Sequence, residues 1–167
     1  MATEKVMRSK MRHYINTGAT PIPWKQLNKG ITSLTSSYNP EIEEEAYIGD
    51  DVKTKYATKL ATETTFDMLY DSADLANAYI FGIMWDRKIG SDAETYLLSV
   101  DMTDATTTGT EPDIVTTYEA VKDKVSIVYN SMGDEAVKPL KISVSLVHQG
   151  DPVFGQYEPI TGVFEPD

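Results

Sequence analysis

The chain has 167 residues, 41% of them hydrophobic, so its length and composition suit a single domain with one core. It contains no cysteine, which excludes disulfide bonds and thiolate metal sites. The formal net charge of −11 argues against a protein that grips nucleic acid, because affinity for phosphates comes from clustered lysine and arginine. No apolar run approaches the roughly 18 to 20 residues of a membrane helix, and the N-terminus lacks the apolar centre of a signal peptide. We therefore expect a soluble protein without a membrane partner.

The charge is unevenly distributed along the chain. Residues 1–30 hold six basic residues and one acid, whereas residues 31–167 hold nine bases and 25 acids. Such a basic head is either a solvated, frayed terminus or an arm that docks on the acidic body of another copy. We expect residues 1–20 to be mobile in a monomer and ordered only between subunits. The basic residues concerned are Lys5, Arg8, Lys10, Arg12, Lys25 and Lys29.

Residues 31–70 predict a long and mostly polar β-hairpin. Leu34, Ser36 and Tyr38 alternate with hydroxyl residues, but neither face is apolar enough for a core strand. Asn39-Pro40 indicates a turn, and Gly49-Asp50 indicates a second one. A monomer gains little by burying such strands, whereas the strands of a neighbour can use their backbone edges. We therefore expect the segment from Tyr47 to Phe66 to span a subunit contact.

One helix is predicted between the strands, from about residue 72 to 88. Asp71 or Ser72 can cap its start, and Gly90 is a plausible stop. Two adjacent apolar stripes follow the helical period and predict that the helix covers one face of a sheet. The stripes are Leu75, Tyr79, Ile83 and Ala76, Ile80, Met84, while Phe81 and Trp85 lie outside them and indicate a second apolar contact.

Further strands are predicted after the helix. One is centred on residues 97–100, and Thr103–Asp113 is threonine-rich and predicts a mobile surface loop. The clearest amphipathic strand carries Leu140, Ile142, Val144, Leu146 and His148 on one face, and Gly150-Asp151-Pro152 predicts its end. The last residues predict one or two short strands.

The sequence does not indicate catalysis, a cofactor or a metal site. His13 and His148 are the only histidines, and neither lies in a spacing that places two ligands together. Glu43–Glu45, Asp50-Asp51 and Asp101 with Asp104 lack the calcium-loop pattern of an EF-hand and are more typical of solvated edges. No GxSxG, P-loop or GxGxxG string occurs. We therefore expect a protein that is not an enzyme, with His148 packed or capping.

Several short strings occur along the chain in a fixed order. They are Tyr14–Gly18 (YINTG), Pro23–Pro40 (PWKQLNKGITSLTSSYNP), Glu45–Ile48 (EAYI), Ile89–Thr95 (IGSDAET) and His148–Gly155 (HQGDPVFG). Each string is weak alone, but together their order and spacing resemble, over nearly the entire chain, the major tail tube proteins of long-tailed, non-contractile phages of Gram-positive bacteria.

The resemblance implies a mainly β fold, a β-sandwich or rolled barrel with one flanking helix and the long polar hairpin. It implies a basic arm at residues 1–30 and a tail tube domain at residues 31–167. Such proteins form hexameric rings that stack into a hollow tube, through which the DNA genome passes into the host without specific binding. The expected partners are further copies of the chain and the tape-measure, tail terminator and distal tail proteins. The expected location is the virion, with assembly in the cytoplasm of the bacterial host.

Nine residues are candidates for subunit contacts, from the basic arm and the hairpin. They are Lys5, Arg8, Lys10, Arg12, Tyr47, Lys53, Lys55, Ala57 and Thr62.

Three other functions stay open at this point. A tube protein of a phage-tail-like bacteriocin or secretion machine shares the architecture but encloses no genome. A monomeric β-sandwich carbohydrate-binding module would display aromatic platforms, and the chain has ten tyrosines but only two tryptophans. A hydrolase would need a catalytic set built wholly from dispersed residues.

Overall fold

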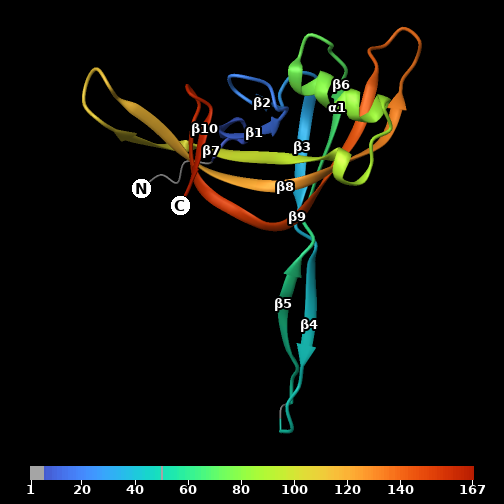
Figure 1. The fold of residues 1–167 in the computed structure, drawn as a ribbon. Coiled ribbons are helices and arrows are strands. Elements are labelled where there is room, and N and C mark those ends of the chain that lie inside the picture. Colours follow the sequence, from blue (N-terminus) through green and yellow to red (C-terminus); the bar gives the residue numbers. More distant parts are fainter. Residues whose placement is uncertain (1–5, 50) are drawn as a thin grey trace.

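The computed structural model describes residues 6–49 and 51–167, which form one strongly curled antiparallel sheet with a single α-helix (Figure 1). The strand order is β2-β1-β7-β8-β9-β6-β3, with β10 paired to β9, and β4 and β5 form a separate two-stranded sheet. The predicted class, mainly β with one flanking helix and a long hairpin, is confirmed. The strands are β1 (Met11–Asn16), β2 (Trp24–Gln26), β3 (Ile31–Ser37), β4 (Pro40–Glu45), β5 (Thr54–Leu60), β6 (Glu63–Leu69), β7 (Glu94–Thr108), β8 (Val115–Gly133), β9 (Lys141–Glu158) and β10 (Val163–Pro166).

The long strand β9 pairs with different neighbours along its length. The first part of β9 pairs with β6 and β8, and its second part pairs with β8 and β10. The expected end at Gly150-Asp151-Pro152 is wrong, because β9 continues through these residues and bends there (Figure 1). The loop expected at Thr103–Asp113 is also partly wrong. Its first half extends β7 to Thr108, which pairs with Val115 of β8.

Apolar side chains lie on both faces of this sheet and form two cores. The larger core lies under α1 (Leu75–Trp85) and includes Leu97, Ile142 and Leu146. The smaller core lies where β1, β2, β7, β8 and β9 meet, and it includes Leu98 and Tyr157. Leu97 and Leu98 are both completely buried although they are adjacent in one strand, so β7 is covered on both faces.

The helix is shorter than predicted, and its ends are built from other residues. Asp74 is the N-cap, and its side chain accepts a hydrogen bond from the amide of Asn77 at 3.0 Å. At the other end, the amides of Arg87 and Lys88 donate to the carbonyls of Met84 and Ile83. This is the Schellman pattern, with Arg87 in the left-handed region (φ 53°) where Gly90 was expected.

Only part of the predicted apolar stripes is buried. Ala76, Ile80, Ile83 and Met84 face the core, but Leu75 is 56% exposed, so the expectation that Leu75 covers the sheet is wrong. The second apolar contact is present. Phe81 stacks on Tyr70 and on Trp85, with ring centroids 4.2 and 5.6 Å apart, and Tyr70 and Phe81 pack against the larger core.

Residues after position 10 belong to the sheet and core, which corrects the expectation that residues 1–20 lack a place in the monomer. Met11 to Ile15 pair with β7, and Tyr14 and Ile15 are buried. Trp24 and Leu27 are buried as well. Strands β1 and β2, which precede residue 30, therefore belong to the same sheet as the strands that follow. The segment ahead of β1 that the structure describes is residues 6–10, with a short 3-10 turn at Arg8–Lys10.

Candidate assembly surfaces and the concave hollow

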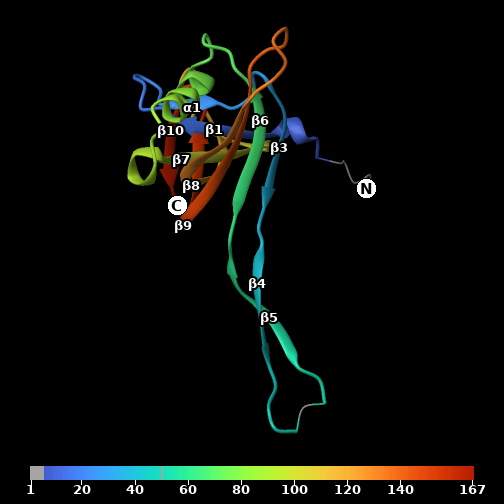
Figure 2. The same ribbon diagram turned by 90° about the vertical axis from the view of Figure 1, so that its right-hand side faces the viewer.

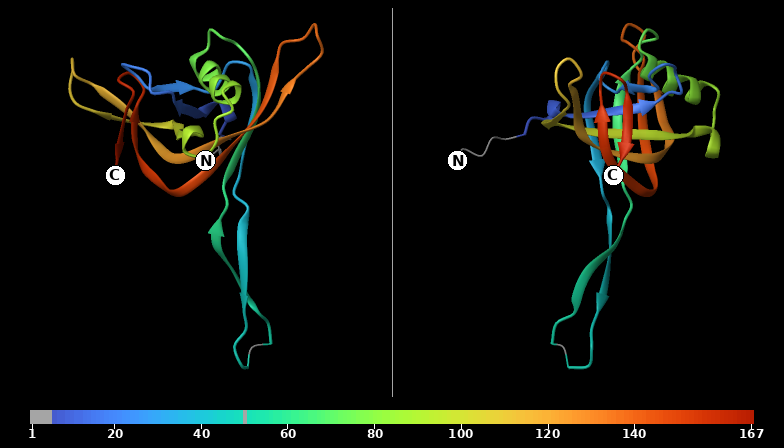
Figure 3. Two further views of the ribbon diagram at one scale, coloured as in Figure 1. Left: turned by 45° about the vertical axis from the view of Figure 1, so that its right-hand side comes forward. Right: turned by 60° about the vertical axis from the view of Figure 1, so that its left-hand side comes forward.

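A long hairpin stands off the body of the molecule (Figures 1 and 2). It begins as β3 paired with β6 and continues as β4 paired with β5, with Ser37 opposite Glu63 and Pro40 opposite Leu60. The turn expected at Asn39-Pro40 is wrong, because the chain kinks there, with Asn39 at φ 40°, and then continues along the hairpin. Two further views show the same projecting arm, β4 and β5, beyond the curled sheet (Figure 3).

The projecting arm has no core of its own. Every residue of β4 and β5 is exposed, including Ile42, Tyr56 and Leu60. Tyr47, Ile48 and Val52 are exposed near its tip. An isolated two-stranded hairpin is only marginally stable in water. Its apolar side chains and free backbone edges are therefore available to another protein surface.

The candidate contact residues of the arm occupy different positions on it. Lys53 and Lys55 both pair with Glu44, at 3.4 and 2.6 Å, so their charges are partly compensated within the hairpin. The Tyr47 hydroxyl donates to Glu45, and Ala57 lies opposite Ile42. Thr62 lies at the base, where its carbonyl accepts the amide of His148. Thr62 thus anchors the arm to its own sheet, while the other four lie on the arm itself.

The basic candidates that the structure describes, Arg8, Lys10 and Arg12, are also exposed. The Arg8 guanidinium donates to the carbonyl of Met11 at 2.6 Å and reaches that of Leu34 at 3.4 Å, which links the N-terminal turn to β3. Lys10 is in the same turn, and Arg12 lies in β1 opposite Val100. Lys5 lies outside the described residues.

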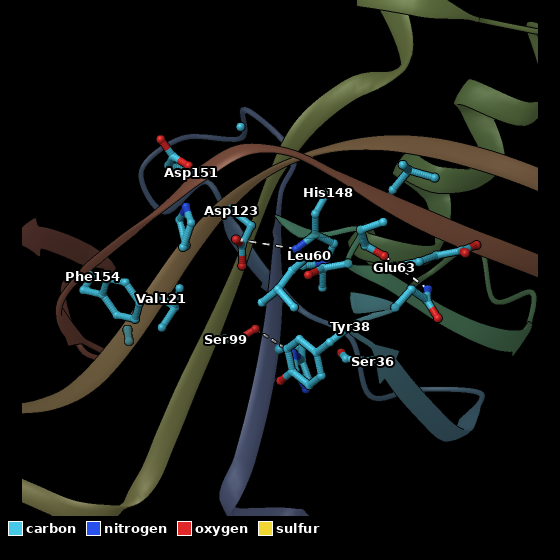
Figure 4. A pocket seen from close by; sticks show the side chains of 18 of the residues that line it. Ser36, Tyr38, Leu60, Glu63, Ser99, Val121, Asp123, His148, Asp151 and Phe154 are labelled. Atoms are coloured by element: carbon cyan, nitrogen blue, oxygen red, sulfur yellow. Dashed lines mark hydrogen bonds and ion pairs between the residues drawn. The ribbon is translucent and has the colours of Figure 1, made fainter. Parts of the chain in front are cut away.

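A concave hollow of about 1610 Å³ lies between the base of the hairpin and strands β1, β7, β8 and β9 (Figure 4). On six strands, an apolar residue packed under α1 has a polar residue two positions away on the same face. Five of these six polar residues line the hollow, and the sixth, Thr64, is fully buried. We call these six residues the polar belt. They are His13, Ser36, Thr64, Ser99, Asp123 and His148.

Hydrogen bonds and one longer contact, between His148 and Asp123, join the polar belt into one chain and one pair. Ser36 and Thr64 share a hydrogen bond of 2.9 Å, and Thr64 and His148 Nε2 share one of 3.0 Å. His148 Nδ1 lies 3.5 Å from the Asp123 carboxylate, and His13 Nδ1 lies 3.0 Å from the Ser99 hydroxyl. The belt therefore ties the base of the hairpin to the body of the sheet.

Electrostatics keep His13 neutral. Burial, with smaller contributions from the nearby Arg8 and His148, lowers the pKa of His13 to about 4. The rim of the hollow is acidic, with the side chains of one lysine and six acids among its lining residues. The acids are Glu63, Asp101, Glu119, Asp123, Asp151 and Asp167, and the lysine is Lys59.

The order Thr64, His148, Asp123 has the connectivity of a hydrolase triad, but its geometry does not suit catalysis. Thr64 is 0% exposed, and its hydroxyl is shared with Ser36 as well as with His148, so it cannot approach a substrate. The contact from Asp123 to His148 is longer than a good hydrogen bond. The arrangement satisfies polar groups at the edge of a core. The packed role expected for His148 agrees with these contacts.

The polar belt could not be found from motifs, because its members come from six strands that are distant in the sequence. The only signal was local: in the strand of residues 140–148, the apolar face ends in His148. The described residues hold no group of three or more metal-ligating side chains. Within 6–49 and 51–167, no helix has the length and apolarity to cross a membrane.

Comparison with known proteins gives a relationship in fold. No protein-family model matches the chain, and no curated protein matches it by sequence. A chain from the tail of an empty GTA particle, computed with helical refinement and C6 symmetry, aligns with a TM-score of 0.55 and 11% identity. The alignment covers 90% of this chain and 98% of that one. A chain of the sixfold-symmetrised anti-feeding prophage (AFP) baseplate aligns with a TM-score of 0.48 and 11% identity, over 92% and 97% of the two chains. The fold is therefore shared with a particle tail subunit.

Proposed function

We propose that this chain is the major tail tube protein of a long-tailed, non-contractile phage of Gram-positive bacteria. In this proposal, it assembles into hexameric rings that stack into a hollow tube. The tube conducts the DNA genome into the host without binding it specifically. The fold shared with the GTA tail subunit supports a tail role, and the C6 symmetry of that tail supports sixfold rings. The role is structural and requires neither a catalytic group nor a cofactor.

One observation carries the proposal: the fully exposed arm of β4 and β5. A hairpin without a core does not stabilise a monomer, yet this one presents Ile42, Ile48, Val52 and Leu60 to solvent. Burial of these side chains against another copy would supply a hydrophobic contribution of ~25 cal/mol per Å² of apolar surface. The arm of one subunit would then contact a different surface of the next subunit. Such heterologous contacts build rings and filaments.

We assign the subunit contacts to two groups of residues. The arm contributes Tyr47, Lys53, Lys55 and Ala57, with Thr62 at its base. The basic N-terminal segment contributes Lys5, Arg8, Lys10 and Arg12, which complement the acidic body. We limit the predicted N-terminal arm to the segment ahead of β1. In this proposal, the tail tube domain begins with that strand. The further partners are the tape-measure, tail terminator and distal tail proteins, in the virion and in the host cytoplasm during assembly.

Negative-stain electron microscopy of the purified protein over a range of concentrations tests the proposal. We expect rings or tubes at high concentration, with sixfold symmetry in end-on averages. Particles that stay monomeric at every concentration would contradict it. Oligosaccharide binding by such monomers would instead favour the carbohydrate-binding module.

A further inference from the structure

The sheet face opposite α1 is rich in hydroxyl side chains between β3 and β8. Along β6, Thr64, Phe66 and Met68 point into the core under α1, so Thr65 and Asp67 point to the opposite side. The register continues this side across the sheet, with Thr35 opposite Thr65 and Ser145 opposite both Thr65 and Val128. Six hydroxyl residues dominate it. We call it the hydroxyl face, defined by Thr35, Ser37, Thr65, Ser126, Ser143 and Ser145.

The composition of the hydroxyl face does not suit a protein contact. The cores of protein interfaces are enriched in aromatic residues, methionine and arginine and depleted in serine. Among the hydroxyl residues, the exposed apolar side chains are the short Val128 and Val147, which are 41% and 39% exposed. The larger Leu69 and Tyr96 lie at the ends of the face, opposite Lys141 and Lys124. The middle of the face is therefore poor in large apolar anchors.

Both lysines at the ends of the hydroxyl face are held by carboxylates. Lys141 Nζ lies 2.9 Å from Asp67 Oδ2, and the Ser143 hydroxyl donates to the other oxygen of the same carboxylate. Lys124 Nζ lies 2.6 Å from Glu94 Oε2. These pairs raise the pKa of both lysines, so the amines stay protonated but are already neutralised by a partner.

We propose that the hydroxyl face lines the lumen of the tube, and that Asp67 and Glu94 mask its lysines so that duplex DNA slides past. This rests on the proposed function. A free lysine would bind phosphate and release counterions, and every ring of the tube would repeat that contact along the DNA. A lysine paired within its own sheet offers no such contact. Serine and threonine hydroxyls keep the wall hydrated without fixing a charge.

Single cysteines test the position of the face, because the chain has no cysteine of its own. Thr65→Cys and Ser126→Cys place a thiol on the hydroxyl face by small substitutions. Both should react, in assembled tubes, with a small maleimide that diffuses through the lumen but not with a maleimide on a polymer too wide to enter. In the monomer, both should react with either reagent.

Three results of the labelling would overturn the inference. Reaction of the tubes with the wide reagent places the face on the outside, and reaction with neither reagent places it between subunits. Both results leave the proposed function intact, since tubes are present. Failure of wild-type protein to form tubes removes the proposed function and this inference together.

The masking of the lysines has a separate test. Tubes of an Asp67→Asn, Glu94→Gln double variant should retain a short DNA duplex in pelleting assays at low salt, by about tenfold more than wild-type tubes. The retention should disappear at high salt, and also when Lys124→Gln and Lys141→Gln are added. Equal retention by the double variant and wild type would contradict the masking role.

Discussion

At the scale of single residues, the polar belt shows how the core ends. The strands that carry apolar residues under α1 switch to polar side chains where the helix no longer covers them, and these side chains bond to one another. Among the described residues, no buried side-chain polar atom lacks a partner. His13 has the tightest electrostatic constraint in the belt, because it must stay neutral to stay buried.

Acid should destabilise the protein through His13. Its pKa is about 4 in the folded state and 6.5 ordinarily, so the unfolded state binds more protons between these values. The contribution of neutral His13 to the free energy of unfolding is fully present above pH 6.5. As the pH falls to 4, the free energy of unfolding decreases by about 3 kcal/mol. Denaturant unfolding from pH 7 to pH 4 measures it against His13→Gln, which lacks the titrating group. A parallel decline in both proteins would contradict this role of His13.

The helix separates two residues that the sequence periodicity treats alike. Leu75 and Ile83 belong to one stripe, but Ile83 is 3% exposed and Leu75 is 56% exposed. Periodicity indicates that a face is apolar, but it does not say where the sheet beneath the helix ends. Leu75 is the first helical residue and lies beyond that support.

We expect Ile83→Ala to cost about 2–5 kcal/mol of unfolding free energy, the usual range for a large-to-small change in a core. Leu75→Ala, the matched control, should cost less than about 0.5 kcal/mol because the side chain is already in water. Thermal and denaturant unfolding of the monomer measure both. Similar costs for the two variants would show that the helix packs differently from the structure.

At the scale of elements, the sequence predicted the hairpin but not its shape. Alternation identified the strands, and the lack of an apolar face identified their exposure. Asn39-Pro40 favours a turn, yet here Asn39 takes a positive φ and redirects a hairpin that continues. Local turn chemistry cannot distinguish a kink from a reversal, since the difference is set by pairing with β5 and β6.

A proline in the arm should separate folding from assembly. Ala57→Pro removes a backbone donor from β5, which contributes no buried residue to either core. We expect the monomer to lose less than about 0.5 kcal/mol of stability and to lose ring and tube formation in electron micrographs. Ala57→Ser keeps the donor and should assemble normally. A large loss of monomer stability in Ala57→Pro would place the arm in the fold's core.

At the scale of the whole molecule, one domain was predictable but its two cores were not. Leu97 and Leu98 break simple alternation, and bulges between Lys122 and Lys124 and between Tyr129 and Ser131 reset the register of β8 against β9. Such long, bent strands pair with different neighbours at their two ends. The N-terminal residues show the same limitation. Within a basic segment, Tyr14 belongs to the smaller core and Ile15 to the larger one.

A Lys5→Gln, Lys10→Gln double variant should test the basic segment as an assembly element, because it removes two positive charges. The sheet begins at Met11, and Arg8 keeps its contacts to Met11 and Leu34, so the variant should fold with an unchanged thermal midpoint. Its polymerisation, followed by light scattering, should be slower than that of the wild type and less sensitive to salt. Growth at the full rate would remove this segment from the subunit contacts.

Hydrogen exchange of the arm in free and polymerised protein tests the central claim most directly. In the monomer, amides of residues 40–60 should exchange quickly, because an exposed two-stranded hairpin opens at little cost in free energy. In tubes they should be strongly protected, while the amides of β7 and β8 in the sheet change little. Equally fast exchange of the arm in both states would contradict the account, because its strands would then have no partner in the assembly.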